Sequence, residues 1–272
     1  MQQEWRFPNL ATPEGSSAYY SVRFAPSVLH DDLAALLGWR HQVRAILDKV
    51  SDQGVARLKL QWWREELGRT FAGEPRHPLS QALQPVLERH QLPEDAFLDM
   101  AGRVESEILY RHPADEAALD AHCKQDLGSL FELIARCHAR TDSAELQTAR
   151  RLGGFCARVY LIRDSGALAR QGRTVLPLEQ LRARGLSAAA LAQREHRDRL
   201  PELLAPAATR AHSALPESDA KRSMPGCIRA RTAILESLLQ ELEGDGLDVA
   251  NQRIGLTPVR KLWLAWKESR RR

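Results

Sequence analysis

The chain has 272 residues, of which 43% are hydrophobic and 27% charged, a composition typical of folded globular proteins that excludes extensive disorder. The formal net charge of +4 permits anionic ligands, phosphates or acidic membrane surfaces, but it does not indicate nucleic acid as a partner. No run of about 18 uncharged apolar residues, no secretory signal over residues 1–10 and no paired cysteine motif occur, which predicts a cytoplasmic protein.

Apolar side chains recur at the helical spacing along most of the chain. The first such stripe predicts a helix over residues 26–50, and Asp52 can cap a second helix that Gly73 can end. Pro225 is expected to kink or split a helix near the C-terminal end. The later helices are predicted over residues 114–139, 143–169, 187–214, 217–243 and 257–270.

The chain contains no alternation of period two, no internal repeat and no linker rich in proline, glycine or serine. Long helices with short connections predict an all-α, antiparallel array packed around a central core. We therefore predict one helical domain over residues 17–272, with an N-terminal extension over residues 1–16.

Four segments, taken in order, resemble the squalene/phytoene synthase family. They are Ser17-Ala18-Tyr19-Tyr20-Ser21 with Pro26; Trp62-Trp63-Arg64-Glu65-Glu66-Leu67 with His77-Pro78; Arg163-Asp164 with Gly172-Arg173 and Leu176-Pro177; and Pro258-Val259-Arg260-Lys261-Leu262-Trp263. The resemblance covers nearly the whole chain. It implies a single-domain, isoprenoid-synthase-type helical array around a central cavity.

The resemblance also implies a chemistry, because members of this family join two prenyl diphosphates head to head. Diphosphate leaves an allylic carbon when magnesium neutralises its developing charge. Magnesium prefers hard oxygen ligands, and aspartates four residues apart project from the same side of a helix. Two facing helices with such aspartates would therefore hold the metal against the diphosphate.

The chain departs from the family at both aspartate motifs. In the first motif, Arg44 and Ala45 replace the leading aspartates and only Asp48 remains, while His41 stands where the family usually has a phosphate-binding arginine. In the second motif Tyr160 stands where an asparagine is frequent, Asp164 is retained, and Leu168 replaces the closing aspartate. Too few charged oxygens remain for a cluster of divalent ions.

Arg44 places a fixed positive charge where the family holds a cation. At an effective dielectric constant of about 20, two unit charges 4 Å apart interact by roughly 4 kcal/mol, which opposes metal binding. Arg44, together with Arg163 and Arg173, could bind a phosphate directly. Alternatively, Arg44 forms an (i, i+4) ion pair with Asp48 on the helix surface.

These observations leave two hypotheses open. The first is a non-catalytic protein without a cofactor that binds an isoprenoid diphosphate or lipid-like molecule, or serves an assembly role with a protein partner. It resembles the branch of the family with degenerate metal motifs, which includes the mitochondrial complex I assembly factor. The residues expected at the polar end of the cavity are Tyr20, His41, Arg44, Asp48, Tyr160, Arg163, Asp164 and Arg173.

The second hypothesis is a divergent head-to-head prenyltransferase that condenses two farnesyl or geranylgeranyl diphosphates. The resemblance then implies magnesium as the cofactor, with Asp48 and Asp164 as its remaining ligands. An assay for a C30 or C40 product separates the two hypotheses.

The C-terminal segment combines Trp263 and Trp266 with a basic cluster that ends in Arg270, Arg271 and Arg272. This composition is typical of a helix that lies at the inner face of a membrane with anionic headgroups. The alternative is a final core helix that carries a solvated arginine tail, and this is the interpretation that the sequence favours.

Overall fold

The computed structural model describes residues 2–109, 112–171, 173–174 and 176–270, and over these ranges it contains helices and no strands. The all-α prediction is therefore confirmed. The α-helices are α1 Ser17–Arg23, α2 His30–Lys49, α3 Gln53–Phe71, α4 Pro78–His90, α5 Glu94–Ile108, α6 Glu116–Cys123, α7 Ser129–Cys137, α8 Ser143–Arg170, α9 Leu178–Arg182, α10 Arg194–Arg197, α11 Leu200–Ala214, α12 Ser218–Arg222, α13 Gly226–Gly244 and α14 Pro258–Arg270. Short 3-10 turns cover Gln2–Trp5, Ser27–Leu29 and Ala189–Ala192, and a π-helical segment, η3, covers Lys124–Gly128.

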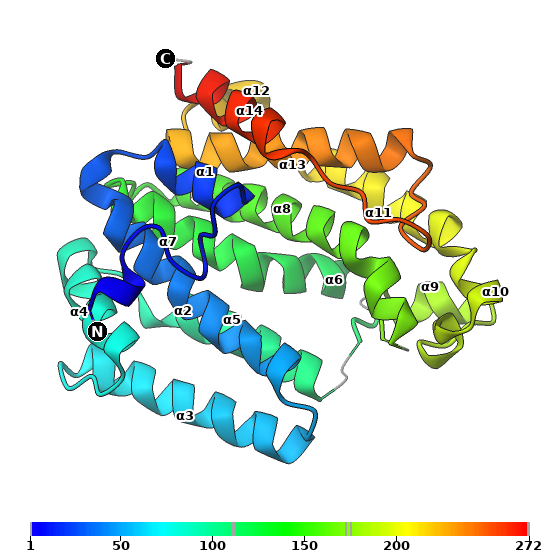
Figure 1. The fold of residues 1–272 in the computed structure, drawn as a ribbon, viewed down its shortest axis with the longest axis horizontal. Helices are drawn as coiled ribbons and strands as arrows, with labels where there is room; N and C mark the ends of the chain where they lie inside the picture. Colours follow the sequence, from blue (N-terminus) through cyan, green and yellow to red (C-terminus); the bar gives the residue numbers. More distant parts are fainter. Residues whose placement is uncertain (1, 110–111, 172, 175, 271–272) are drawn as a thin grey trace.

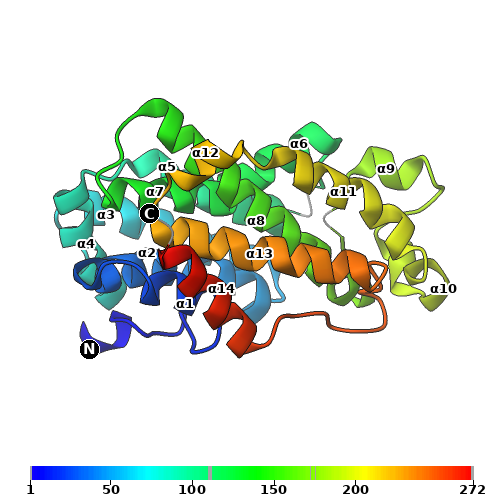
Figure 2. The same ribbon diagram turned by 90° about the horizontal axis from the view of Figure 1, so that it is seen from above.

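The helices stack in layers around α8, the longest helix of the described chain (Figure 1). On one side α8 packs against α13, which in turn contacts α1 and α14 (Figure 2). On the other side it packs against α7 and η3, and these contact α2 and α5. Helix α3 closes the array against α4 and α5. Because all residues from 152 to 159 are buried, α8 is the centre of the core.

The π-helical segment η3 joins α6 to α7 without a break and passes close to α8. Gly153 of α8 makes this approach possible, because a Cβ at that position would overlap the carbonyl oxygen of Leu127. The helix predicted over residues 114–139 is therefore correct in extent but contains a wide turn. Such turns are frequent at functional sites because they change the direction in which side chains point.

Two predicted helices near the C-terminal end have different outcomes. The helix over residues 217–243 is split at Pro225 into α12 and α13, as expected, because proline cannot continue the hydrogen-bond ladder. The helix predicted over residues 187–214 is wrong in its first half, where a 3-10 turn and the short α10 precede α11. Helix α11 begins at Leu200 with Pro201 in its first turn, a position where a missing N–H has no cost.

Helix α14 corrects the expectation of a final core helix. Only Ala265 and Glu268 are buried in it, whereas Val259, Trp263 and Trp266 are 75%, 53% and 42% exposed. Arg271 and Arg272 lie outside the described residues, as does Gly172 of the third resembling segment. In the part of the chain that is described, no helix combines the length and apolarity needed to cross a membrane.

Candidate functional site

The centre of the site is a pair of arginines on one face of α2. Arg40 and Arg44 are four residues apart, so their side chains leave the helix on the same side. Arg40 donates from Nε and Nη2 to the two carboxylate oxygens of Asp126 at 2.6 and 2.7 Å. Arg44 Nη1 lies 3.5 Å from the same carboxylate. The π-helical segment η3 therefore supplies the anion that binds this face of α2.

A second carboxylate, Glu107 at the end of α5, extends the network. Arg44 Nη1 is 3.3 Å from Glu107 Oε1, and Arg103 Nη2 is 3.1 Å from the same atom. Arg173, just after α8, approaches Glu107 Oε2 to 3.9 Å. The ion pairs thus distribute two carboxylates among four guanidinium groups, so this charge network has an excess of positive charge.

Each member of the charge network changes the ionisation of the others. Burial lowers the pKa of Arg40, and the positive charges of Arg44 and Arg231 lower it further, although Asp126 opposes them. Burial alone would lower the pKa of Arg44, but the carboxylates of Asp126 and Glu107 raise it above its ordinary value. Burial would raise the pKa of Asp126, yet Arg40 and Arg44 hold it well below the usual range. All three groups therefore remain charged at neutral pH.

The expected helix-surface pair between Arg44 and Asp48 is wrong. The guanidinium of Arg44 turns inward to Glu107 and Asp126, which lie 63 and 82 residues away in sequence. Asp48 is exposed on the last turn of α2, and so is His41 on the preceding turns. Of the residues predicted on α2, only Arg44 is part of the charge network.

The second motif forms its own group on α8. Arg163 donates to both carboxylate oxygens of Asp164 at 2.7 Å, and its guanidinium carbon lies 4.6 Å from the centre of the Tyr160 ring. Lys261 at the start of α14 is close to this group. Burial lowers the pKa of Lys261, and the positive charge of Arg163 adds to this effect. Each of the two motifs therefore places at least one guanidinium group next to a carboxylate.

Tyr20 is placed apart from the charge network. It is buried on α1 and packs edge-on against Tyr19 at 5.3 Å between ring centroids. It lines a groove of about 540 Å³ with Arg23, Phe24 and Leu262 of α14. The structure thus brings Arg44 and Arg173 to a common carboxylate, groups Tyr160 with Arg163 and Asp164, and leaves Tyr20, His41 and Asp48 outside both groups.

Sequence reasoning missed four members of the charge network: Arg40, Arg103, Glu107 and Asp126. The helical spacing from Arg44 could have identified Arg40, since residues four apart share a face. Glu107 and Asp126 carry no such signal, because their approach depends on how α5 and η3 pack.

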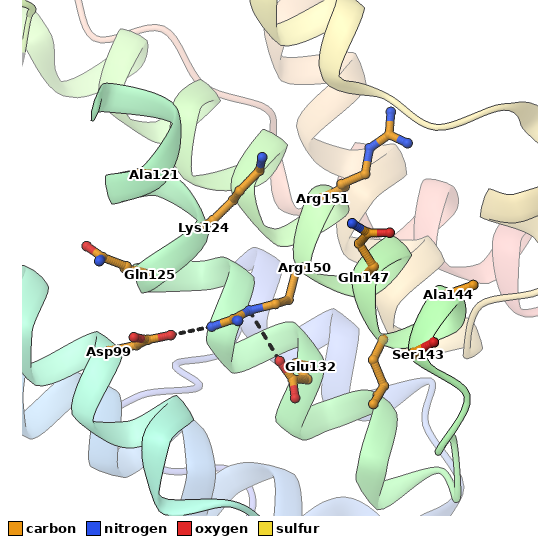
Figure 3. A pocket seen from close by; sticks show the side chains of 11 residues that line it. Asp99, Ala121, Lys124, Gln125, Glu132, Ser143, Ala144, Gln147, Arg150 and Arg151 are labelled. Carbon is orange, nitrogen blue, oxygen red and sulfur yellow. Dashed lines mark hydrogen bonds and ion pairs between the residues drawn. The ribbon is translucent and has the colours of Figure 1, made fainter. Parts of the chain in front are cut away.

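A larger pocket lies elsewhere, on the outer face formed by α5, η3, α7 and the first half of α8 (Figure 3). Its volume is about 810 Å³. Arg150 crosses its floor, paired with Asp99 and with Glu132, whose Oε2 is 3.2 Å from Nε. The pocket contains none of the residues predicted from the sequence motifs, and its charged floor is already internally paired.

The residues at the two motifs do not fit a magnesium cluster. Asp164 is engaged by Arg163, Asp126 by Arg40, and Glu107 by three guanidinium groups. Magnesium requires free, hard oxygen ligands in octahedral geometry. Across the described ranges, no group of three or more histidine, cysteine, aspartate or glutamate side chains is arranged to hold a metal ion.

The sequence model of the family described as squalene/phytoene synthase matches residues 11–261. The chain belongs to this family. Curated relatives include a presqualene diphosphate synthase of Zymomonas mobilis, 27% identical over 64% of this chain and 60% of that protein. A phytoene synthase of Thermus thermophilus is 28% identical over 51% of this chain and 48% of its own length. The chain thus spans about half to three fifths of the first curated relatives that it matches.

A phytoene synthase of Arthrospira platensis matches more fully, with 24% identity over 90% of this chain and 85% of that protein. Among solved structures, a dehydrosqualene synthase in complex with a ligand has a TM-score of 0.75, at 18% identity over 93% of this chain and 90% of its own. A squalene synthase from Alicyclobacillus acidocaldarius has a TM-score of 0.72, at 20% identity over 87% and 91% of the two chains. These likenesses show that this squalene/phytoene synthase family member has the all-α isoprenoid-synthase fold.

Proposed function

We propose that this family member binds an isoprenoid diphosphate, or a lipid-like molecule with a similar polyanionic head, without magnesium and without condensing it. The observation that carries the proposal is Arg44, which is held by Glu107 and Asp126 at the first aspartate motif. A guanidinium there supplies a positive charge that needs no metal. The relatives named after presqualene diphosphate and phytoene support an isoprenoid ligand.

Binding and catalysis make different demands on this site. Guanidinium groups bind phosphate oxygens in a bidentate manner and remain charged, so they suit recognition of a diphosphate. Departure of diphosphate from carbon additionally needs strong neutralisation of the charge that develops, which magnesium provides as a Lewis acid. With Asp164 paired to Arg163, and with Arg44 in place of an aspartate in the first motif, the site offers guanidinium groups to a diphosphate but too few free carboxylates for a magnesium cluster.

We also propose that the chain is part of the metal-motif-degenerate branch of the family. In that branch an assembly role with a protein partner can replace the condensation reaction, since a fold does not fix a function. The supporting observation is that both motifs are altered together, at Arg44 and at Leu168.

The decisive test incubates the purified protein with labelled farnesyl and geranylgeranyl diphosphates, with magnesium or with EDTA. We expect saturable binding of the labelled diphosphate in EDTA, and neither pyrophosphate release nor a C30 or C40 product with magnesium. Formation of such a product, abolished by Asp164→Ala, would instead establish the alternative, head-to-head condensation.

We propose, second, that α14 lies on an anionic membrane surface. Its outward face exposes Val259, Leu262, Trp263 and Trp266. Lys267 Nζ is 5.0 Å from the centre of a Trp263 ring, and the Arg270 guanidinium carbon is 4.6 Å from that of a Trp266 ring. Tryptophan combined with basic side chains is favourable at the headgroup level, and each basic residue contributes about 1 kcal/mol there.

Sedimentation with lipid vesicles tests this surface. We expect the protein to bind vesicles that contain phosphatidylglycerol and not pure phosphatidylcholine, and Trp263→Ser with Trp266→Ser to reduce binding at least tenfold. Trp62→Ser is the matched control, because Trp62 on α3 is similarly exposed at 41%. Equal losses in both variants, or binding that ignores lipid charge, would contradict the proposal.

A further inference from the structure

Arg231 on α13 is a buried arginine for which the described residues provide no hydrogen-bond or ion-pair partner. The residue is only 4% exposed, and its Nε and Nη1 atoms are buried without a hydrogen-bond acceptor. No hydrogen bond or ion pair between the described residues includes its guanidinium. The other deeply buried arginines are paired, Arg103 with Glu107 and Arg158 with Glu116.

The surroundings of Arg231 contribute little to neutralising its charge. The guanidinium carbon lies 5.7 Å from the centre of the Phe131 ring on α7 and 6.0 Å from that of the Tyr160 ring on α8. Both separations are at the outer limit of a cation–π contact. The charged group that acts on it from α2 is Arg40, and the two repel. Arg231 thus lies near enough to Arg40 to repel it, and it adds a fifth guanidinium group to the charge network.

An unpaired guanidinium in the interior is unfavourable for folding. Arginine stays protonated in proteins, so it cannot escape the loss of hydration by becoming neutral. A buried charge that lacks both an opposite charge and hydrogen-bond acceptors is among the more destabilising features of a protein interior. A ligand that brings anionic oxygens would supply both at once.

We propose that Arg231 is a buried anchor for the phosphate oxygens of the ligand, approaching from α13 while Arg40 and Arg44 approach from α2. This inference rests on the proposed function and names the residue that recognises the anionic head. The shared chemistry is a phosphate or diphosphate group. A polyanion fits better than a carboxylate because the ion pairs around Asp126 and Glu107 already leave positive charge in excess.

Arg231→Met keeps a long unbranched side chain and removes the charge, and Arg158→Met is its matched control at a paired, equally buried position. Without ligand, we expect Arg231→Met to raise the melting temperature by roughly 2–4 °C, since it relieves an uncompensated charge. Arg158→Met should lower it, because it removes the ion pairs of Arg158 with Glu116 and Asp120 and leaves Glu116 only the longer contact with Arg210 at 3.8 Å. Arg231→Lys retains the charge and should not stabilise.

Binding is then measured by calorimetry in EDTA with two probes, inorganic pyrophosphate and farnesyl diphosphate. We expect Arg231→Met to weaken both by roughly 10- to 100-fold. A loss for farnesyl diphosphate alone would mean that Arg231 recognises the prenyl chain, and would overturn the anchor. Unchanged affinity, or a melting temperature that falls as in Arg158→Met, would overturn it as well.

The two proposals fail separately. If wild-type protein binds farnesyl diphosphate in EDTA and Arg231→Met binds it equally well, the proposed function stands and the anchor is wrong. If Arg231→Met loses pyrophosphate affinity while wild-type protein forms a C30 product with magnesium, the anchor stands and the proposed non-catalytic function is wrong.

Discussion

Asp126 is the residue on which the interior charge network depends. It accepts two hydrogen bonds from Arg40 and lies 3.5 Å from Arg44. We expect Asp126→Asn to reduce the free energy of unfolding by about 3–5 kcal/mol, because the half-buried guanidinium of Arg40 loses its bidentate carboxylate partner and that of Arg44 loses one of its carboxylate partners. Urea denaturation at neutral pH measures this loss. Asp219→Asn is the control, since Asp219 pairs with Arg222 at 93% side-chain exposure and should change stability little.

The same carboxylate predicts how stability depends on pH. Because Arg40 and Arg44 hold the folded pKa of Asp126 below its unfolded value, its contribution is present above the unfolded pKa of about 3.9. It is lost as the pH falls from there toward the folded pKa. Asp126→Asn should therefore lose less stability than wild-type protein between neutral pH and pH 3. Parallel pH profiles would contradict this assignment.

Arg44 offers a second test at the scale of one residue. Arg44→Asp would place a third carboxylate beside Asp126 and Glu107, both within 3.5 Å of the present guanidinium. We expect millimolar magnesium to raise the melting temperature of this variant by roughly 5–10 °C, and to leave wild-type protein unchanged. Arg44→Ala removes the charge without adding a ligand and should respond weakly. A magnesium response in wild-type protein would show that Arg44 does not exclude the metal.

How much of this network the sequence could predict depends on the distance between its members along the chain. Arg44 in place of an aspartate is visible from the resemblance alone. Its partners are not, because Glu107 and Asp126 approach it through the packing of α5 and η3 against α2. From the sequence alone, the (i, i+4) pair of Arg44 with Asp48 was the ion pair that could be predicted. In the folded protein Arg44 pairs instead with Glu107 and Asp126, which are distant in sequence.

At the scale of elements, Glu66 ties the end of α3 to the start of α4. It is fully buried, and its Oε1 accepts the backbone N–H groups of Arg76 and His77 at 2.7 Å while Arg69 Nε is 2.9 Å from Oε2. His77 in turn caps α4, since its Nδ1 accepts the N–H of Leu79 at 3.1 Å. The Glu66 carboxylate therefore holds the connection between α3 and α4 in place, which explains the spacing between the Trp-Trp segment and His77-Pro78.

We expect Glu66→Gln to destabilise the protein by about 2–4 kcal/mol, because at this buried position an amide replaces one acceptor by a donor that faces the N–H groups of Arg76 and His77 or the guanidinium of Arg69. Glu65→Gln is the control at the adjacent position. Glu65 is exposed, and its one acceptor contact with a described residue is to Gln61 on its own helix, so its change should stay within about 0.5 kcal/mol. Urea denaturation distinguishes the two. Equal effects would show that Glu66 does not order the connection.

Element boundaries were predictable where a local rule decides them and not elsewhere. Pro225 separates α12 from α13 because its ring cannot continue a helix. Residues 187–199 are rich in alanine, which favours a helix, yet they form a 3-10 turn and the single-turn α10. Leu191 is fully buried in this segment, so packing against α8 decides its path over local propensity.

At the scale of the whole molecule, the sequence predicted the fold more completely than the site. Helical periodicity and four resembling segments extend over nearly the whole chain, so many weak signals agree on one all-α domain. The site depends on a few side chains whose positions follow from crossings such as that of η3 with α8 at Gly153. The exposed face of α14 is a second example. The spacing of its apolar residues predicts a helix, but it does not tell whether other helices of the protein cover that face.

The boundary of the domain gives the last prediction. Residues 1–16 were expected to be an extension, but Trp5 is 4% exposed and packs among the core residues, where a glycine, Gly38 of α2, lies against its ring. Asn9 Nδ2 donates to the carbonyl oxygen of Ala34 at 3.1 Å, which fixes the segment on α2. Lys261 Nζ donates to the carbonyl oxygen of Gly15 at 3.1 Å, so the same segment also holds α14.

A core tryptophan contributes far more than an exposed leucine. We expect Trp5→Ala to reduce the free energy of unfolding by about 3–5 kcal/mol, and Leu10→Ala, at a position 63% exposed, to change it by less than about 0.5 kcal/mol. Denaturant unfolding compares the two within one segment. If Trp5→Ala proved as mild as Leu10→Ala, residues 1–16 would be a separable extension and the domain would begin at Ser17. If it is severe, this segment belongs to the domain, because the indole fills space between α2 and α4.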